Sequence, residues 1–169
     1  MKAGITMDEA RQIVFDALES LKINYELTEH PAVFTIEEME RLGITGKGEV
    51  VKNLFLSDEK DRDFYILVLC REKRADLKDI RAKIGSRRLQ LASEDSLYEL
   101  LKLRRGAVTP FGILCDVERK VQVIFDKDVF GFERIGIHPN DNTATVWLAP
   151  CDLKKIIEQN GNVIKIINI

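Results

Sequence analysis

The sequence predicts an α+β fold, with a mixed, mainly antiparallel sheet surrounded by helices. Short apolar runs bounded by turn residues, typical of strands, occur along the whole chain, and two of them, 50–56 and 64–70, lie close enough to form a hairpin. Segments with apolar residues at helical spacing are scattered among these strands. We therefore expect a single domain over residues 1–169.

Two capping boxes mark helix starts in the first quarter of the chain. In each, a threonine is followed three residues later by a glutamate, so that each residue can satisfy a backbone N–H of the other: Thr6 with Glu9, and Thr35 with Glu38. After Thr6, apolar residues recur at helical spacing as far as Leu21. The other elements expected here are a strand at 25–27 that stops before His30-Pro31, a short helix that ends near Gly43, and the hairpin 50–56 and 64–70.

Capping and turn residues divide the second half of the chain. Ser93 is expected to cap a helix, because Glu94 and Asp95 follow it where the helix dipole favours negative charge. Pro150 can open a last helix at its first position, and Gly161 can end it. The expected elements are helices at 77–84, 97–103 and 150–160, strands at 121–125, 135–138, 143–148 and 163–167, and a loop at 106–112.

Composition indicates a soluble protein of a reducing compartment. The chain is 45% hydrophobic, enough to build a core, and 32% charged. Its longest apolar runs are far too short to span a bilayer, and its N-terminus lacks the apolar segment of a secretion signal. Three distant cysteines without a C-x-x-C pair, and only two histidines, argue against a disulfide framework and a transition-metal site. We expect a cytoplasmic protein with no membrane contact, no metal and no cofactor.

Charge is distributed unevenly along the chain. Residues 71–105 hold 11 Lys and Arg against 6 Asp and Glu, a local charge of +5, whereas the remaining residues hold 15 and 22, a local charge of −7. A basic stretch in an acidic protein is a candidate contact for a polyanion. It is equally consistent with a solvated helix face.

No standard catalytic or phosphate-binding motif occurs, whether G-x-S-x-G, G-x-x-x-x-G-K-[ST], H-E-x-x-H or G-x-G-x-x-G. Three polar groups remain: Lys52-Asn53 at the head of an apolar strand, the glycine loop 106–112 and the turn 138–143. Burying an ammonium group is costly unless an anion meets it, so Lys52 either reaches solvent at a strand end or awaits a ligand. Glycines let the loop's N–H groups approach a ligand. Taken singly, each group also fits an exposed side chain or a plain turn.

Taken together and in order, these segments resemble a known family. The residues concerned are His30-Pro31, Phe34-Thr35-Ile36-Glu37-Glu38, Val51-Lys52-Asn53-Leu54-Phe55-Leu56, Gly106-Ala107-Val108-Thr109-Pro110, and His138-Pro139 with Asn142-Thr143-Ala144. They are similar to the YbaK-like superfamily, which includes the editing domain of bacterial prolyl-tRNA synthetases. They look most like its free-standing prolyl-tRNA deacylase branch, often called ProX or PrdX. The resemblance covers essentially the whole chain, although many relatives have a cysteine where this chain has Val51.

The resemblance implies a trans-editing aminoacyl-tRNA deacylase that hydrolyses the ester of mischarged tRNA(Pro), with alanyl-tRNA(Pro) as the expected substrate. A pocket for proline excludes the smaller alanine poorly, because a missing methylene is worth only about 1–3 kcal/mol. In the family, the substrate's own ribose hydroxyl assists the attacking water, which would explain the lack of a nucleophile–base pair. The alternatives are a deacylase for cysteinyl- or seryl-tRNA, and a non-catalytic tRNA-binding or regulatory module.

The same resemblance implies roles for individual residues. Lys52 would bind the terminal adenosine phosphate as a point charge, N–H groups of the Gly106 loop would bind the carbonyl or its developing oxyanion, and His138 would line the amino-acid pocket without acting as a general base. These three are the expected catalytic positions. The expected substrate-binding residues are Phe34, Thr35, Asn53, Ala107, Val108, Thr109, Pro110 and Asn142. The expected tRNA-binding residues are Arg87, Arg88, Arg104 and Arg105. The expected partners are mischarged tRNA(Pro) and, transiently, prolyl-tRNA synthetase.

Overall fold

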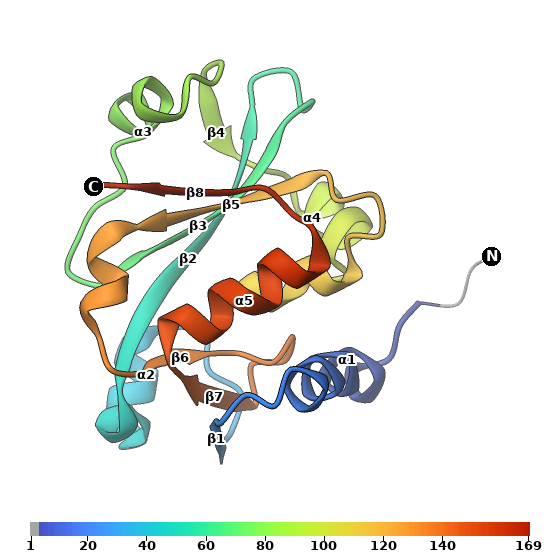
Figure 1. The fold of residues 1–169 in the computed structure, drawn as a ribbon, viewed down its shortest axis with the longest axis vertical. Coiled ribbons are helices and arrows are strands. Elements are labelled where there is room, and N and C mark those ends of the chain that lie inside the picture. The colour runs from blue at the N-terminus through green and yellow to red at the C-terminus, as the bar shows by residue number, and fades with distance from the viewer. Residues whose placement is uncertain (1–3) are drawn as a thin grey trace.

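The computed structural model of the chain describes residues 4–169 and is organised around one eight-stranded sheet (Figure 1). Seven strands follow the order β1-β7-β6-β2-β3-β5-β8, and β4 branches from β2. The strands are β1 (Glu26–Glu29), β2 (Glu49–Asp58), β3 (Phe64–Cys70), β4 (Leu89–Leu91), β5 (Val121–Asp126), β6 (Ile135–Ile137), β7 (Ala144–Leu148) and β8 (Ile164–Ile167). Four strand pairs are antiparallel and three are parallel, which confirms the predicted mixed, mainly antiparallel sheet.

The helices cover both faces of this sheet. They are α1 (Met7–Ser20), α2 (Ile36–Arg41), α3 (Leu77–Ile84), α4 (Glu94–Leu101) and α5 (Pro150–Asn160), with 3-10 turns η1 (Ile44–Lys47), η2 (Pro110–Cys115) and η3 (Lys127–Gly131). Apolar residues of α1, α4 and α5 join the main core on one face, and those of α3 form a smaller core on the other. No helix of the described chain combines the length and the hydropathy that crossing a membrane requires.

Strand β3 shows why one sheet can hold two cores. Its residues alternate between the faces: Ile66 and Val68 belong to the main core, whereas Leu67 and Leu69 belong to the smaller one. All seven of its residues are buried. A strand covered on both faces has no polar side to show, which explains the uninterrupted apolar run in the sequence.

The capping signals in the sequence are confirmed. Both capping boxes form, Ser93 accepts a hydrogen bond from the Ser96 N–H at the start of α4, and Gly161 ends α5 in the left-handed conformation. The sequence did not reveal β4, because two of its three residues are exposed and the strand exists only through its pairing with β2.

Candidate active site

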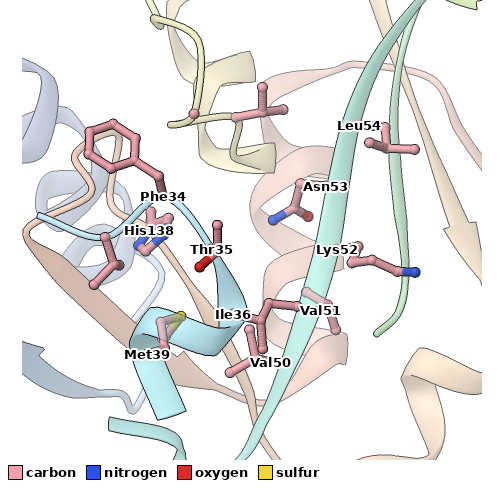
Figure 2. Close-up of a pocket in the computed structure, with 13 residues that line it drawn as sticks. Phe34, Thr35, Ile36, Met39, Val50, Val51, Lys52, Asn53, Leu54 and His138 are labelled. Atoms are coloured by element: carbon pink, nitrogen blue, oxygen red, sulfur yellow. The ribbon is translucent and has the colours of Figure 1, made fainter. Parts of the chain in front are cut away.

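A gap in the sheet along β2 positions the site. On the side away from β3, β2 pairs with β6 only through Glu49 and Val50, and with β4 only from Leu56 onward. Between these two ladders, no strand among residues 4–169 covers that edge of β2. The unoccupied edge lies beside α2, which packs across the opening (Figure 2).

Backbone alternation decides which groups face the gap. The Cys70 N–H donates to Asp126, away from β2, and the Phe55 carbonyl accepts from the Ala92 N–H at 3.0 Å. Cys70 lies opposite Val51, so alternate β2 residues starting from Val51 turn their N–H and C=O away from β3. Of the three members between the two ladders, Phe55 already bonds Ala92, Val51 adjoins the β6 ladder, and Asn53 is the central one. Its backbone N–H and C=O therefore point into the opening.

The hollow at this gap has a volume of about 280 Å³. Three segments that are distant in the sequence meet there: residues 33–39 around the start of α2, residues 50–54 of β2, and the loop and turn that carry Gly106, Val108 and His138 (Figure 2). Most of its walls are apolar. The structure thus brings together the predicted residues Phe34, Thr35, Lys52, Asn53, Gly106, Val108 and His138.

The capping box of Thr35 and Glu38 holds in place the wall of the hollow that Phe34 forms. A carboxylate oxygen of Glu38 accepts from the Phe34 N–H at 2.6 Å and from the Thr35 N–H at 3.3 Å. The Thr35 hydroxyl accepts from the Glu38 N–H at 3.1 Å, and Thr35 itself lines the hollow. Asn142 supports the preceding residue from behind, since its amide donates to the Val33 carbonyl at 3.1 Å. Asn142 therefore shapes this wall without lining the hollow itself.

Gly106 is needed at its position for two reasons. Its φ of +83° lies in the left-handed region, where a side chain is strained. A Cβ at this position would also lie 2.7 Å from the Phe34 ring. The Phe34 ring thus packs directly on the glycine backbone, and any larger residue would displace it.

His138 offers an unprotonated nitrogen at the wall of the hollow. Its Nδ1 lies 2.9 Å from the Ala144 carbonyl, which can only accept, so Nδ1 carries the proton and Nε2 is an acceptor. Burial lowers the pKa of His138 below its ordinary 6.5, although the bond to Ala144 opposes this shift. At neutral pH the ring is therefore uncharged.

Thr109 and Pro110, predicted to bind substrate, do not line the hollow. Both are buried beneath the loop. The Thr109 hydroxyl donates to the His138 carbonyl at 2.6 Å and accepts from the Phe111 N–H as the cap of η2. The Thr109 hydroxyl thereby ties the loop to the His138 turn. Because this hydroxyl is buried and already paired, it is not available to a ligand.

Asn53 and Lys52 point in opposite directions from β2, as consecutive strand residues must (Figure 2). Asn53 points toward the hollow, and its side-chain oxygen is buried without a hydrogen-bond partner in the described structure. The Lys52 ammonium donates to the Lys73 carbonyl on the other side of the strand. Lys73 is itself held by Asp126 at 2.9 Å and Asp128 at 2.6 Å. Lys52 is also the fourth residue of β2, not a strand-end residue as expected.

The four arginines predicted to bind tRNA lie in two separate places. Arg104 and Arg105 line a second hollow on the other side of Phe34, together with Ala107 and Asn142. Arg87 and Arg88 lie next to β4, at the opposite end of β2 from α2 (Figure 1). The Arg87 guanidinium already pairs with the fully buried Asp58 at 3.3 Å. The structure therefore places only the first pair beside the candidate site.

The apolar walls of the hollow were not foreseen as site residues. They include Val33, Ile36, Met39 and Val50. The available signal was the Thr35 capping box, because a helix that starts there presents Ile36 and Met39, three residues apart, on one side. Among the described residues, no group of three or more His, Cys, Asp or Glu side chains could hold a metal ion.

Comparison with known proteins identifies the family. Residues 30–156 match the model of the aminoacyl-tRNA editing domain. The chain belongs to this family. It is 49% identical over 161 residues to the prolyl-tRNA editing protein ProX of Acetoanaerobium sticklandii, covering 95% of this chain and 98% of that one. It is 35% identical to the prolyl-tRNA synthetase associated domain-containing protein 1 of Danio rerio, covering 93% and 86%.

A solved structure agrees with this assignment at the level of the fold. It is described as a candidate trans-editing enzyme for prolyl tRNA synthetase, and it matches with a TM-score of 0.69 at 20% identity, covering 97% of this chain and 99% of that one. The fold, the family and the predicted resemblance are thus confirmed. As a family member, the chain is an aminoacyl-tRNA deacylase, an ester hydrolase whose substrate includes tRNA.

Proposed function

We propose that the chain hydrolyses alanyl-tRNA(Pro) in trans, with the alanyl group held in the hollow beside Asn53. The observation that carries this proposal is a small, mostly apolar space lined by Asn53 and His138. The Asn53 side-chain oxygen has no partner in the described structure, the Asn53 carbonyl faces the gap, and His138 Nε2 is unprotonated. An α-ammonium group supplies three donors and a charge that such acceptors favour.

The size of the hollow supports a small amino acid. Its volume of about 280 Å³ is just below the usual range for ligand pockets, which begins at roughly 300 Å³. Met39 and Val50 close it, and both pack in a third, separate cluster with Val33, Ile44 and Trp147, so displacing this wall is costly. We propose that this wall is what discriminates alanine from the larger proline ring.

The chemistry needs little from the protein, because an aminoacyl ester is already activated. The site contains no Ser-His-Asp or Cys-His set, and its histidine is neutral with one nitrogen committed to a carbonyl. We infer that the neighbouring ribose hydroxyl of the substrate assists the attacking water. N–H groups of the Gly106 loop and of Asn53 are the donors that could stabilise the developing oxyanion.

Lys52 remains the proposed phosphate ligand. Its side chain lies at the rim between the hollow and the neighbouring surface of Thr35 and Arg71. Its ammonium group now faces one backbone carbonyl, a weaker partner than a phosphate. We propose that it exchanges the Lys73 carbonyl for the phosphate of the terminal adenosine when tRNA binds.

The proposed partner is mischarged tRNA(Pro) in the cytoplasm, with transient contact to prolyl-tRNA synthetase, from which the mischarged tRNA is released. The proposal also extends to the domain organisation, with one editing domain formed by residues 1–169. The proposed contact with prolyl-tRNA synthetase is consistent with the name of the 35% identical relative, which refers to a domain associated with that enzyme.

A panel of deacylation assays tests the function. The purified full chain is incubated with tRNA(Pro) charged with alanine, cysteine, serine or proline. We expect release of alanine and retention of proline. Release of cysteine or serine in preference to alanine would contradict the proposed substrate but support the proposed ester hydrolysis. If none of the four esters is hydrolysed while the tRNA still binds, the chain is a non-catalytic tRNA-binding module and the proposal fails.

A further inference from the structure

A second hollow of about 300 Å³ lies directly beyond Phe34. It is enclosed by the start of α1, the end of α4 with the following residues 102–107, and the turn 140–142. Phe34 lines both hollows. Gly106 and Val108 line the first hollow and Ala107 lines the second, so this short loop and the Phe34 ring together form the partition between them.

Exposed aromatic and cationic groups mark this second hollow. Tyr98 and Phe34 are 38% and 64% exposed, which is high for such large rings. The Lys102 ammonium and the Arg104 guanidinium lie 5.7 Å and 5.3 Å from the centre of the Tyr98 ring. Among residues 4–169, neither Arg104 nor Arg105 forms an ion pair. Aromatic faces beside free cations are what single-stranded nucleic acids bind.

A buried acceptor completes the lining. Asn140 is 7% exposed, and its amide donates to the Ala10 carbonyl at 3.2 Å. Its side-chain oxygen is buried and has no partner in the described structure. Asp141 beside it is occupied by Thr143 and lies 3.7 Å from the Arg11 guanidinium. A buried acceptor left unpaired at the wall of a hollow calls for a donor on the ligand.

We propose that this second hollow binds the adenine base of the nucleotide that carries the ester. The base stacks on Tyr98, its exocyclic amine donates to the Asn140 oxygen, and Arg104 and Arg105 neutralise the phosphates of the strand that leads to it. The ribose then lies at the Phe34 partition, with its ester in the first hollow and its base in the second. This inference rests on the proposed function, since it assumes that an aminoacyl ester occupies the first hollow.

The test uses adenosine monophosphate and inosine monophosphate, because inosine has an oxygen in place of the exocyclic amine. Each is titrated into the full ¹⁵N-labelled chain, and backbone amide shifts are followed by NMR. We expect adenosine monophosphate to shift the amides of Ala107, Asn140 and their neighbours. It should bind roughly 2- to 10-fold more tightly than inosine monophosphate, the range expected for one hydrogen bond. Equal affinity, or shifts confined to the Lys52 side or to Arg87 and Arg88, would overturn the proposal.

Two variants of one residue separate stacking from other roles of the ring. Tyr98→Ala should weaken adenosine monophosphate binding roughly 5- to 150-fold, the range for one base–aromatic stack. Tyr98→Phe keeps the ring and should bind as the wild type does. Binding that survives Tyr98→Ala would show that the base stacks elsewhere.

Measuring wild-type hydrolysis of alanyl-tRNA(Pro) in parallel keeps the two proposals distinct. Hydrolysis without nucleotide shifts at Ala107 and Asn140 overturns the base site and leaves the proposed function intact. Shifts there without hydrolysis of any ester support the base site and overturn the deacylase.

Discussion

The two hollows on either side of Phe34 are similar in size and opposite in character. The first is about 280 Å³, and its polar side chains are the neutral Thr35, Asn53 and His138, with the Lys52 ammonium turned away. The second is about 300 Å³ and carries three cations, Lys102, Arg104 and Arg105. A neutral, mostly apolar space suits hydrolysis of an ester, since bulk water weakens polar contacts there less than at an open surface. A cationic surface suits capture of a polyanion. In the proposed function, changes on the first side therefore affect turnover, and changes on the second affect binding.

Lys52→Ala should have the largest effect. If its ammonium group moves onto the substrate phosphate, its loss should lower kcat/KM for alanyl-tRNA(Pro) by about 10²–10³-fold, as for other single electrostatic contacts in active sites. Circular dichroism should stay unchanged, because within residues 4–169 the ammonium group donates to a single backbone carbonyl. Lys78→Ala, an exposed lysine on α3, is the control. Near-normal activity would show that Lys52 merely packs against the 73 loop.

Gly106→Ala tests the partition between the two hollows. The new methyl group would collide with the Phe34 ring, and a left-handed residue with a side chain costs about 1–2 kcal/mol of stability. A shift of the wall by about 1 Å should lower kcat/KM roughly 100-fold. Gly85→Ala is the matched control, since Gly85 is also left-handed but a Cβ there meets nothing within 4 Å. Equal loss of activity in both variants would mean that stability alone is responsible.

Asn53→Ala should separate activity from stability. Losing an acceptor for a charged ammonium should lower kcat/KM about 10- to 100-fold. Removing a buried oxygen that has no partner in the described structure should leave the melting temperature unchanged or raise it. Asn168→Ala, at an exposed position, is the control for both measurements. A marked fall in melting temperature would show that Asn53 supports the fold.

Charge reversal at Arg104 and Arg105 should act on binding. The double variant Arg104→Glu/Arg105→Glu should raise KM for tRNA more than it lowers kcat, and should reduce the slope of log KM against log salt by about 2. Arg88→Glu at the far end of β2 is the control and should change neither. A rise in KM for Arg88→Glu as large as that of the pair would place the tRNA along the β4 end.

The pH dependence should show the smallest effect and report on His138. Its folded pKa lies below 6.5, so kcat/KM should be flat near neutral pH and fall as the pH drops through that lowered pKa, where Nε2 becomes protonated. The unfolded chain takes up this proton more readily, so the free energy of unfolding should also fall as the pH drops below about 6.5. His138→Gln should remove the inflection in kcat/KM. A profile unchanged by this substitution would show that protonation of His138 plays no part in the reaction.

Local signals predicted the elements of the fold well. The two capping boxes, the Ser93 cap and the Gly161 stop each depend on residues within one turn of each other, so the sequence contains all that they require. Strand β4 was missed because its only stabilising partner, β2, is more than 30 residues away. The pairs Arg87-Arg88 and Arg104-Arg105 looked equivalent in the sequence, because only contacts between distant segments decide which pair lies beside the hollow.

The sequence by itself determined the family, the elements and the set of polar residues available to a site. Strand alternation even required Lys52 and Asn53 to point in opposite directions. Only the tertiary structure decided which of them faces the hollow, because that depends on where β6 leaves β2 and where β4 joins it. It also placed Asn140 beside Tyr98 and Arg104, to which no local pattern connects it. A cavity is formed by packing between distant segments, and its lining is therefore a property of the folded chain.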